Sequence, residues 1–255
     1  MKHLDSSASE NHPLKAIDLL EALAQTPENM GVSQLSESTG LSKSTVHRIL
    51  GALVDRQYVI KDEATKQYRL GFKVLSLSAN VLDSIEIKRL TRDEMLKLAK
   101  LTEETVHLIC LDGGEGVYID KIDTPNSIGL MSRIGKRLPL YCTSGGKALL
   151  SYQSPEWIDA YLRNTPFQKH TANTITDPEA LRQELAQVRK QGFALDQEEH
   201  HENITCIAVP ILKRGDQALA SISLAAPSYR FSIQRALMYK DTMLEMAREI
   251  SAKIS

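Results

Sequence analysis

Apolar residues recur every three or four positions in the N-terminal part of the chain, which predicts three short helices between residues 12 and 55. The first eleven residues are polar and are expected to form a disordered tail. A second helix over VSQLSEST would end at Gly40, because a residue without Cβ adopts the left-handed conformation of a helix C-terminus at little cost. The first helix would bury apolar side chains about one turn apart: Leu14, Ile17, Leu20 and Leu23.

The third helix is expected to begin after Ser42, whose hydroxyl can cap the first N–H groups of a helix. The chain continues with two short β-like runs, YVIK and QYRLG, joined by the polar segment DEATK, which predicts a β-hairpin. Three helices followed by a hairpin form a winged helix-turn-helix, and we predict this domain over residues 12–72. The buried stripe of the third helix follows the spacing i, i+3, i+4, i+7: Val46, Ile49, Leu50 and Leu53.

The face of the third helix opposite its buried stripe suits double-stranded DNA. The major groove admits one helix, whose N-terminal side chains reach base edges, and hydroxyl groups at the helix start match phosphates. Residues 40–75 carry seven basic and three acidic side chains, a net +4, whereas residues 12–39 carry one basic and four acidic, a net −3. A small protein-interaction module with a solvated basic face is the alternative. The residues expected to contact DNA are Ser42, Lys43, Ser44, Thr45, His47, Arg48 and Lys66.

Residues 73–102 contain no proline and have a helical pattern, with a break expected near residues 83–86. A linker helix between two domains can be a self-association surface, can couple the domains mechanically, or can pack only against its own domain. Its apolar stripe would comprise Val74, Leu77, Val81 and Ile85.

From residue 103 to residue 255 the pattern predicts an α+β domain, an antiparallel sheet with flanking helices rather than a doubly wound parallel sheet. Helices are expected after the capping residues Ser154 and Asp177, each followed by proline, and near Ser232; the second of them would end at Gly192. A Gly-rich turn would follow the first strand, and a tight turn is expected at RGDQ. Strands are expected over TVHLICLD, VYIDKID, IGLMSRI, FALDQ, ITCIAVPILK and ALASISLAA.

Composition narrows the class of protein. The 255 residues have a net charge of −1, 42% hydrophobic and 25% charged side chains, which is typical of a globular chain and not of a general polyanion binder. No apolar run is long enough for a transmembrane helix, and the N-terminus lacks the apolar core of a signal peptide, so we expect a cytoplasmic protein without membrane contact. The cysteines are odd in number and far apart, which excludes a disulfide framework: Cys110, Cys142 and Cys206.

Catalytic and metal-binding motifs are weak. Residues 145–147 lack the spacing and the hydroxyl of a phosphate-binding loop. Cys206 lies in an apolar run typical of an inert thiol, and Cys142 precedes a helix start without a partner base. We expect no catalytic residue, no metal and no cofactor. One group of potential metal ligands has no diagnostic spacing and is expected to be solvated surface: Asp196, Glu198, Glu199, His200 and His201.

A candidate anion site lies in the segment SRIGKRLPLYCTSGGKALLSY, where Arg133, Lys136 and Arg137 precede a helix start rich in small residues. The N-terminus of a helix has N–H groups without an intrahelical partner and a partial positive charge. An anion site with no nucleophile beside it indicates binding rather than turnover. The N–H groups expected to face a ligand are those of Ser144, Gly145 and Gly146.

Three motifs in this order resemble the IclR family of bacterial transcriptional regulators over nearly the whole chain: GLSKSTVHRILGAL, RIGKRLPLYCTSGGKALL and GFALDQEEHHENITCIAVPI. Within the family, the stretches SRIGKRLPLY, TANTIT and LDQEE are most similar to the KdgR-like regulators of sugar-acid catabolism. The resemblance implies a winged helix-turn-helix joined by a helix to a GAF-like effector domain. It also implies dimers, often paired into tetramers, and small carboxylate effectors.

The resemblance further implies an effector pocket in which the ligand's carboxylate or keto group meets the backbone of the candidate anion site. An ionised Asp196 would accept hydrogen bonds from ligand hydroxyls. A second pocket serine of the family falls on Ala225, so that hydrogen bond is absent, and Asn203 replaces a usual glycine but tolerates a left-handed turn. The residues expected at the effector site are Ser144, Gly145, Gly146, Asp196, Cys206, Ser223 and Arg133.

We therefore expect an effector-controlled repressor of sugar-acid catabolism genes. Its partners would be double-stranded operator DNA, a small carboxylate such as 2-keto-3-deoxygluconate or an aldonate, and further copies of the chain in a homodimer or homotetramer. Within the family, the alternative is an activator that responds to an aromatic or other organic acid. Outside the family, the alternative is an enzyme that acts on the same acids through Cys142 or Cys206.

Overall fold

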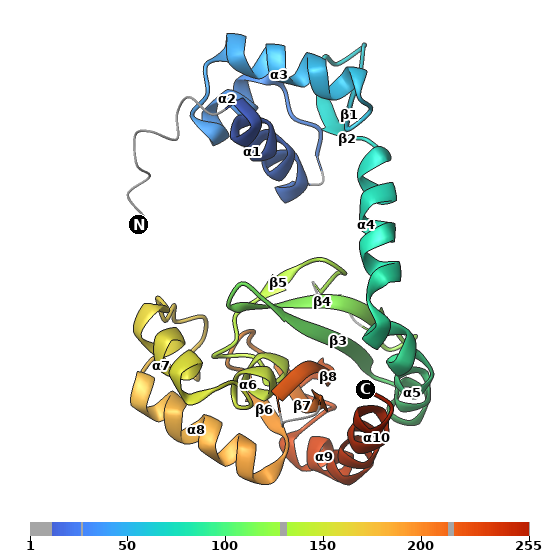
Figure 1. Ribbon diagram of the computed structural model, residues 1–255, viewed down its shortest axis with the longest axis vertical. Coiled ribbons are helices and arrows are strands. Elements are labelled where there is room, and N and C mark those ends of the chain that lie inside the picture. The colour runs from blue at the N-terminus through green and yellow to red at the C-terminus, as the bar shows by residue number, and fades with distance from the viewer. Residues whose placement is uncertain (1–11, 27, 128–131, 214–216, 255) are drawn as a thin grey trace. The chain divides into compact units, whose positions relative to one another are not determined.

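The computed structural model describes residues 12–26, 28–127, 132–213 and 217–254 (Figure 1). The chain divides into two compact units between Ser84 and Ile85. The first unit holds the helices and the hairpin that the sequence predicts for a DNA-binding domain. The second holds the predicted α+β domain, and each unit is described separately.

The N-terminal unit has the predicted winged helix-turn-helix order. Gly40 ends the second helix with φ 71°, and the hydroxyl of Ser42 accepts a hydrogen bond from the Thr45 N–H at the start of the third. Tyr68 pairs with Met30, which joins the hairpin to the segment before the second helix. The elements are α1 (His12–Gln25), α2 (Val32–Thr39), α3 (Lys43–Asp55), β1 (Val59–Lys61) and β2 (Tyr68–Leu70).

One prediction about the core of this unit is wrong. Leu14 and Ile17 of α1 are 44% and 49% exposed, and the fully or almost fully buried residues of this helix are Leu19 and Leu23. Helix α1 is apolar on more than one face, and its packing against α2 and α3 selects the face with Leu19 and Leu23. The stripe of α3 is correct, with half-buried Leu53 beside the buried Val46, Ile49 and Leu50.

Two helices occupy the predicted linker segment, and the predicted break falls at Ile85. Helix α4 (Lys73–Ser84) belongs to the N-terminal unit and buries none of its residues within the described chain. Helix α5 (Glu86–Thr102) belongs to the C-terminal unit and packs against its sheet. The boundary between the units therefore lies inside the segment 73–102 rather than at either of its ends.

The C-terminal unit is built on a six-stranded antiparallel sheet with the strand order β5-β4-β3-β8-β7-β6. This sheet with its helices confirms the predicted α+β class. The first hairpin turns at Gly113 and Gly114, whose positive φ values of 58° and 93° explain the glycine pair. The strands are β3 (Thr105–Asp112), β4 (Glu115–Ile122), β5 (Arg137–Leu138), β6 (Ala194–Gln197), β7 (Ile204–Lys213) and β8 (Gln217–Pro227).

Helices cover both faces of this sheet (Figure 1). Helix α6 packs on β7 and β8, where Ala148 meets Ala194 and Ala208. The alternate residues along the strands, such as Ile207 and Leu224, are also buried and point to the other face of the sheet, which α5 and α10 cover. The helices of this unit after α5 are α6 (Ser144–Leu150), α7 (Pro155–Asn164), α8 (Pro178–Gln191), α9 (Ile233–Met238) and α10 (Lys240–Ala252).

The structure corrects two predicted elements of this unit. The last helix is divided at Tyr239 into α9 and α10, although Ser232 caps its start as predicted. In the expected strand IGLMSRI, residues 128–131 lie outside the described residues, residues 132–134 form a loop, and the edge strand is Arg137–Leu138 instead. The tight turn predicted at RGDQ lies mostly outside the described residues. None of the helices in the described part of the chain is long and apolar enough to span a membrane.

Candidate functional site

The start of α3 presents a hydroxylated and basic surface. Ser42 Oγ lies 3.1 Å from Ser44 Oγ and 2.9 Å from Thr45 Oγ1, so the three hydroxyls form one cluster at the helix N-terminus. Thr45 is half-buried. The other predicted DNA-contact residues at the start of this helix are exposed: Ser42, Lys43, Ser44, His47 and Arg48. Their spacing places them away from the buried stripe, as a helix that enters a DNA groove requires.

The hairpin after α3 forms the wing. Asp62 Oδ1 accepts hydrogen bonds from the N–H groups of Ala64 and Thr65, and Lys66 has a positive φ of 59°, which closes the turn. The ammonium of Lys66 lies 2.8 Å from Glu63 Oε2. Lys66 is therefore at the wing tip as predicted, with its charge partly compensated.

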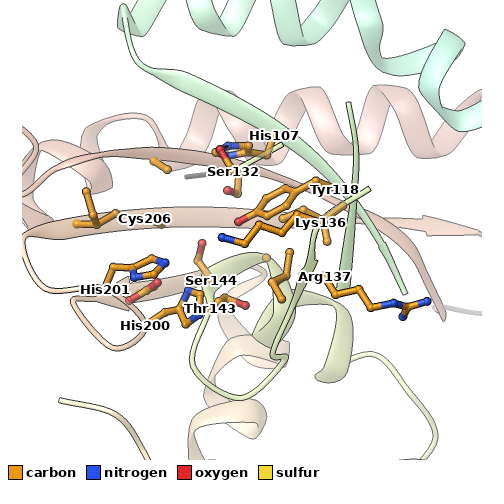
Figure 2. A pocket seen from close by; sticks show the side chains of 17 residues that line it. His107, Tyr118, Ser132, Lys136, Arg137, Thr143, Ser144, His200, His201 and Cys206 are labelled. Carbon is orange, nitrogen blue, oxygen red and sulfur yellow. Dashed lines mark hydrogen bonds between the residues drawn. The ribbon is translucent and has the colours of Figure 1, made fainter. Parts of the chain in front are cut away.

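A pocket opens on the α6 face of the sheet in the C-terminal unit (Figure 2). Directly paired residues of antiparallel strands share a face. In one row of the floor, Asp196 of β6 pairs with Cys206 of β7, which pairs with Ala225 of β8. In the next row, Ser223 of β8 pairs with His107 of β3.

The pocket brings together most of the predicted effector-site residues but not all of them. Gly146 is not at its lining, because the Gly146 N–H donates to Thr143 Oγ1 at 3.2 Å and is not available to a ligand. Arg133 is an exposed side chain outside the lining, while the neighbouring Lys136 is part of it. The predicted residues that do line the pocket are Ser144, Gly145, Asp196, Cys206 and Ser223.

The two glycines of α6 are required for packing, which the sequence did not indicate. A Cβ at Gly145 would overlap Ile109 Cδ1, and a Cβ at Gly146 would lie 2.5 Å from the Cα of Leu140. Ser221 Oγ also donates a hydrogen bond to the Gly145 carbonyl at 3.0 Å. Helix α6 therefore packs closely against Ile109 and Ser221 of the sheet and against Leu140 of the segment before the helix. The N–H groups of its first turn at Ser144 and Gly145 have no intrahelical acceptor and lie beside the pocket.

Asp196 is a buried pocket carboxyl with a strongly altered proton affinity. Burial raises its pKa to about 7, with a further contribution from the charge of Glu199. The carboxyl also accepts a hydrogen bond from the Glu199 N–H at 2.7 Å, which closes the turn after β6. Near neutral pH Asp196 is therefore divided between its ionised form, which only accepts hydrogen bonds, and its acid form, which also donates.

Beneath the pocket, a buried lysine holds α6 to two other elements. The Lys147 ammonium is 1% exposed and lies 2.7 Å from Glu199 Oε1 and 3.0 Å from Glu184 Oε1. Burial lowers the pKa of Lys147, but the two carboxylates outweigh that effect and the net shift is upward. Glu199 Oε2 has no hydrogen-bond partner among the described residues. The ion pair connects α6 to α8 and to the loop after β6.

The prediction that the potential metal ligands at residues 196–201 are solvated surface is wrong for most of them. Asp196 and Glu199 are buried, and His200 is half-buried between His170 and His201, with ring centroids 5.0 Å and 4.1 Å away. Burial lowers the pKa of His200 to about 3, so its imidazole is neutral. In the described ranges of the chain, no group of three or more His, Cys, Asp or Glu side chains could hold a metal ion.

Sequence reasoning missed several polar side chains at the pocket. A histidine within the apolar strand TVHLICLD was the one available signal, because a polar residue on the buried face of a strand needs a partner. Tyr118 lies in β4, and the others come from loops whose course the sequence does not specify. These residues are His107, Tyr118, Ser132, Thr143, His200 and His201.

The thiols of the C-terminal unit have the properties of inert cysteines. Burial raises the pKa of Cys142 and of Cys206 well above its ordinary value, and nearby carboxylates add to both shifts. Since the thiolate is the nucleophile, neither group is activated. Asn203 has φ 61°, which confirms that this position uses the left-handed conformation.

The altered pKa of Asp196 predicts a pH dependence of stability. The folded carboxyl has a pKa of about 7 and the unfolded one about 3.9, so the folded state binds the proton more tightly and the wild type loses stability as pH rises between these values. The Asp196→Asn variant retains an acceptor for the Glu199 N–H and removes the titration. The free energy of unfolding of the variant minus that of wild type should increase by about 2–3 kcal/mol when the pH is raised from 5 to 8. Denaturation followed by the fluorescence of Trp157 measures this, and a constant difference would contradict the assigned pKa.

The two units define a class of protein, a transcriptional regulator with a winged-helix DNA-binding unit and a separate domain that carries a small-molecule pocket. The chain belongs to the IclR family of bacterial transcriptional regulators. The IclR helix-turn-helix domain matches residues 14–63, and the bacterial transcriptional regulator IclR C-terminal domain matches residues 79–252. This membership confirms the resemblance seen in the three sequence motifs and the expectation that the protein is a regulator and not an enzyme.

Individual relatives agree with this assignment. The chain is 38% identical over 241 residues to the HTH-type transcriptional regulator KdgR of Escherichia coli K12, covering 94% of this chain and 91% of that protein. The solved IclR of Thermotoga maritima has a TM-score of 0.79 at 33% identity over 95% of this chain and 98% of its own. An IclR homologue from Microbacterium hydrocarbonoxydans, solved in complex with 4-hydroxybenzoate, has a TM-score of 0.83 at 22% identity over 96% and 99%, a likeness that shows the fold alone.

Proposed function

We propose that this protein is a cytoplasmic repressor that binds operator DNA through α3 and the wing and releases it when a sugar acid fills the pocket of the C-terminal unit. The effector class is a small hydroxylated carboxylate such as 2-keto-3-deoxygluconate or an aldonate. The observation that carries the proposal is the lining of the pocket, which combines a cation, helix N–H groups and a row of hydroxyl-binding side chains. Similarity to KdgR at 38% identity supports the same effector class.

The carboxylate of such an effector has a matching environment at one end of the pocket. Lys136 extends into the pocket toward Ser144 at the start of α6, whereas Arg137 points away (Figure 2). The guanidinium of Arg137 lies 2.5 Å from Asp112 Oδ2. An ammonium group together with N–H groups at a helix start stabilises an anion. The carboxylate of the effector would therefore lie between Lys136 and the N–H groups of Ser144 and Gly145.

The hydroxyl groups of the effector would meet Asp196, Ser223 and the hydroxyl of Ser144. A pocket that binds an aromatic acid needs apolar surface on both faces of the ligand's ring. Tyr118 is the one Phe, Tyr or Trp side chain among the described lining residues, and more than half of these residues carry polar or charged side chains. This composition favours a sugar acid over the aromatic-acid alternative.

Release of DNA requires that the effector bind the DNA-free arrangement of the protein more tightly than the DNA-bound one, because a ligand with equal affinity for both shifts nothing. The test is a screen of sugar acids and aromatic acids against the full chain by thermal shift, followed by operator binding with each acid that binds. An acid at 100 times its dissociation constant should stabilise the protein by about 2.7 kcal/mol. Stabilisation by 4-hydroxybenzoate but by no sugar acid would favour the alternative.

The exposed start of α3 leads to a prediction for DNA recognition. Replacing Arg48 by alanine should weaken operator binding by about 1–3 kcal/mol and relax the preference for one base pair, if the guanidinium reads a base edge. Arg56, also exposed but at the C-terminal end of the same helix, provides the control. Binding to a set of single-base operator variants measures both effects. An Arg48→Ala variant with unchanged affinity for every sequence would contradict this orientation of α3.

We also propose a homodimer that pairs through α4. This helix leaves an apolar face uncovered within the described chain, with Leu77 and Val81 each at least half exposed. A second copy fits this face, since a two-fold dimer would present two α3 helices to half-sites about one helical turn apart or a multiple of it. The Leu77→Glu variant should sediment as a smaller species and bind a pseudo-palindrome more weakly, whereas Ser76→Glu on the neighbouring surface should not. A monomeric wild type with a single half-site footprint would contradict the proposal.

A further inference from the structure

His107 stands apart from the residues discussed so far. It lies in the middle of β3, is 2% exposed, and lines the end of the pocket opposite Ser144, His200 and His201 (Figure 2). Its Nε2 lies 2.8 Å from the hydroxyl of Ser132. Its Nδ1 is buried and has no hydrogen-bond partner in the part of the chain that the structure describes.

An unpartnered buried nitrogen is energetically unfavourable. A buried polar group without a hydrogen bond costs about 1–3 kcal/mol, and native proteins rarely retain one without a reason. Because His107 lines a pocket, the molecule that fills the pocket can provide the missing partner. His107 thus indicates where a polar group of that molecule lies.

The protonation state of His107 limits what that polar group can be. Burial, with the charge of Lys121, lowers its pKa to about 3, so the imidazole is neutral and has one donor and one acceptor. The Ser132 hydroxyl can either donate to Nε2 or accept from it, which leaves both tautomers open. A ligand hydroxyl satisfies Nδ1 in either tautomer, whereas a carboxylate satisfies only the tautomer that carries the proton on Nδ1.

The charges around His107 also disfavour a carboxylate at this end. The ammonium of Lys121 donates to the Ser132 carbonyl at 3.1 Å and lies 2.9 Å from Asp123 Oδ1, so its charge is partly compensated. The ring of Tyr118 lies 4.8 Å from the imidazole, and burial raises the pKa of Tyr118, which keeps its phenol neutral. The side chains of His107, Ser132 and Tyr118 at this end are neutral and can form hydrogen bonds.

The register of the sheet sets the distance between His107 and Asp196, which is proposed above to bind hydroxyl groups of the effector. Asp196 and His107 lie on strands β6 and β3, which are separated by β7 and β8. Three interstrand spacings amount to roughly 14 Å between the backbones, and side chains from both ends shorten the gap. A two- or three-carbon acid cannot contact both Asp196 and His107, whereas an acid of five or six carbons with hydroxyl groups along its chain can.

We propose that His107 is a specificity-determining residue whose Nδ1 binds a hydroxyl of the effector that lies several carbons from the hydroxyl bound by Asp196. This inference rests on the proposed function and narrows the effector to extended hydroxy acids, which excludes short keto acids as full ligands. Ser132 is a positioning residue that holds the imidazole through Nε2.

The test compares three probes by calorimetry on the full chain: D-gluconate, 6-deoxy-D-gluconate, which lacks the terminal hydroxyl, and pyruvate, which has a carboxylate but no extended chain. Wild type should bind D-gluconate roughly five- to tenfold more tightly than the deoxy analogue, the effect of one buried hydrogen bond between neutral groups. Two variants form a matched pair. In His107→Asn the amide is as many bonds from the backbone as Nδ1, and in His107→Gln it is as many bonds away as Nε2.

His107→Asn should retain a preference for D-gluconate, and His107→Gln should lose it while its affinity for pyruvate stays that of wild type. An equal preference in wild type and in both variants would overturn the assignment of His107. Equal weakening of all three probes would mean that His107 only supports the fold, which also overturns it. If the probes bind with the expected preference but leave operator affinity unchanged, the proposed repressor function fails and the role of His107 in recognition stands. If no probe binds wild type, both proposals fail.

Discussion

Replacing Lys147 by methionine should destabilise the C-terminal unit by about 3–5 kcal/mol, since removal of one partner of a buried ion pair leaves an uncompensated charge. The side chain of Glu199 is 7% exposed, and its Oε2 has no partner among the described residues even when Lys147 is present. Without the ammonium, Glu199 must take up a proton or move to solvent, and the loop after β6 that carries His200 and His201 would move with it. Unfolding followed by the fluorescence of Trp157, the single tryptophan of the chain, measures the loss.

Two controls separate the buried pair from general disruption of α6. The Glu184→Gln variant removes the partly exposed partner of Lys147 and should cost about 1 kcal/mol or less, because its carboxylate is already in contact with solvent. The double variant Lys147→Met, Glu199→Leu removes both buried charges and should recover most of the stability. If the double variant is as unstable as Lys147→Met, packing around α6 and not the unpaired Glu199 is responsible.

Replacing Gly146 by alanine is the second change with a large expected effect, a loss of about 2–4 kcal/mol. The new Cβ would lie 2.5 Å from Leu140 Cα and from Thr143 Oγ1, and 2.7 Å from the Leu140 carbonyl. Two of these contacts are with backbone, which cannot rotate away, and overpacking of this kind costs about 1–3 kcal/mol. The cap between Thr143 Oγ1 and the Gly146 N–H would be displaced as well, for about 1 kcal/mol more.

The matched control is Gly51→Ala in α3, where a Cβ meets nothing within 4 Å. In a helix interior this change should stabilise by about 0.5–1 kcal/mol, because alanine loses less conformational freedom than glycine. Circular dichroism follows the secondary structure of both units, and Trp157 fluorescence follows the C-terminal unit. A Gly146→Ala protein as stable as wild type would mean that α6 can shift away from Leu140, contrary to the close packing described above.

Local sequence signals predicted the element boundaries well. The cap at Ser42, the Pro-initiated helices after Ser154 and Asp177, and the left-handed end at Gly192 all depend on residues within one helical turn of each other. The helix-turn-helix and the antiparallel sheet followed from these signals and from the periodicity of apolar residues. The face that a helix buries depends on its neighbours instead, and for this reason the stripe predicted for α1 was wrong.

The chemistry of the pocket was predictable only in part. The resemblance to the family predicted that Asp196, Cys206 and Ser223 line one site, and in the structure all three line one pocket. The pairing of Lys147 with Glu199 joins residues 52 positions apart and has no signature in the spacing of either. The same is true of His107 and Ser132, which meet because a loop returns to β3.

The most direct test of the account is the effect of a sugar acid on operator binding in wild type and in Asp196→Ala. An operator obtained by selection from random DNA is titrated with protein by fluorescence anisotropy at rising concentrations of 2-keto-3-deoxygluconate or D-gluconate. The account predicts release of wild type, an unchanged operator affinity of Asp196→Ala without acid, and a midpoint for release shifted upward by the factor of about 5 to 150 that corresponds to the loss of 1–3 kcal/mol. Release of both proteins at the same acid concentration, or of neither, would contradict it.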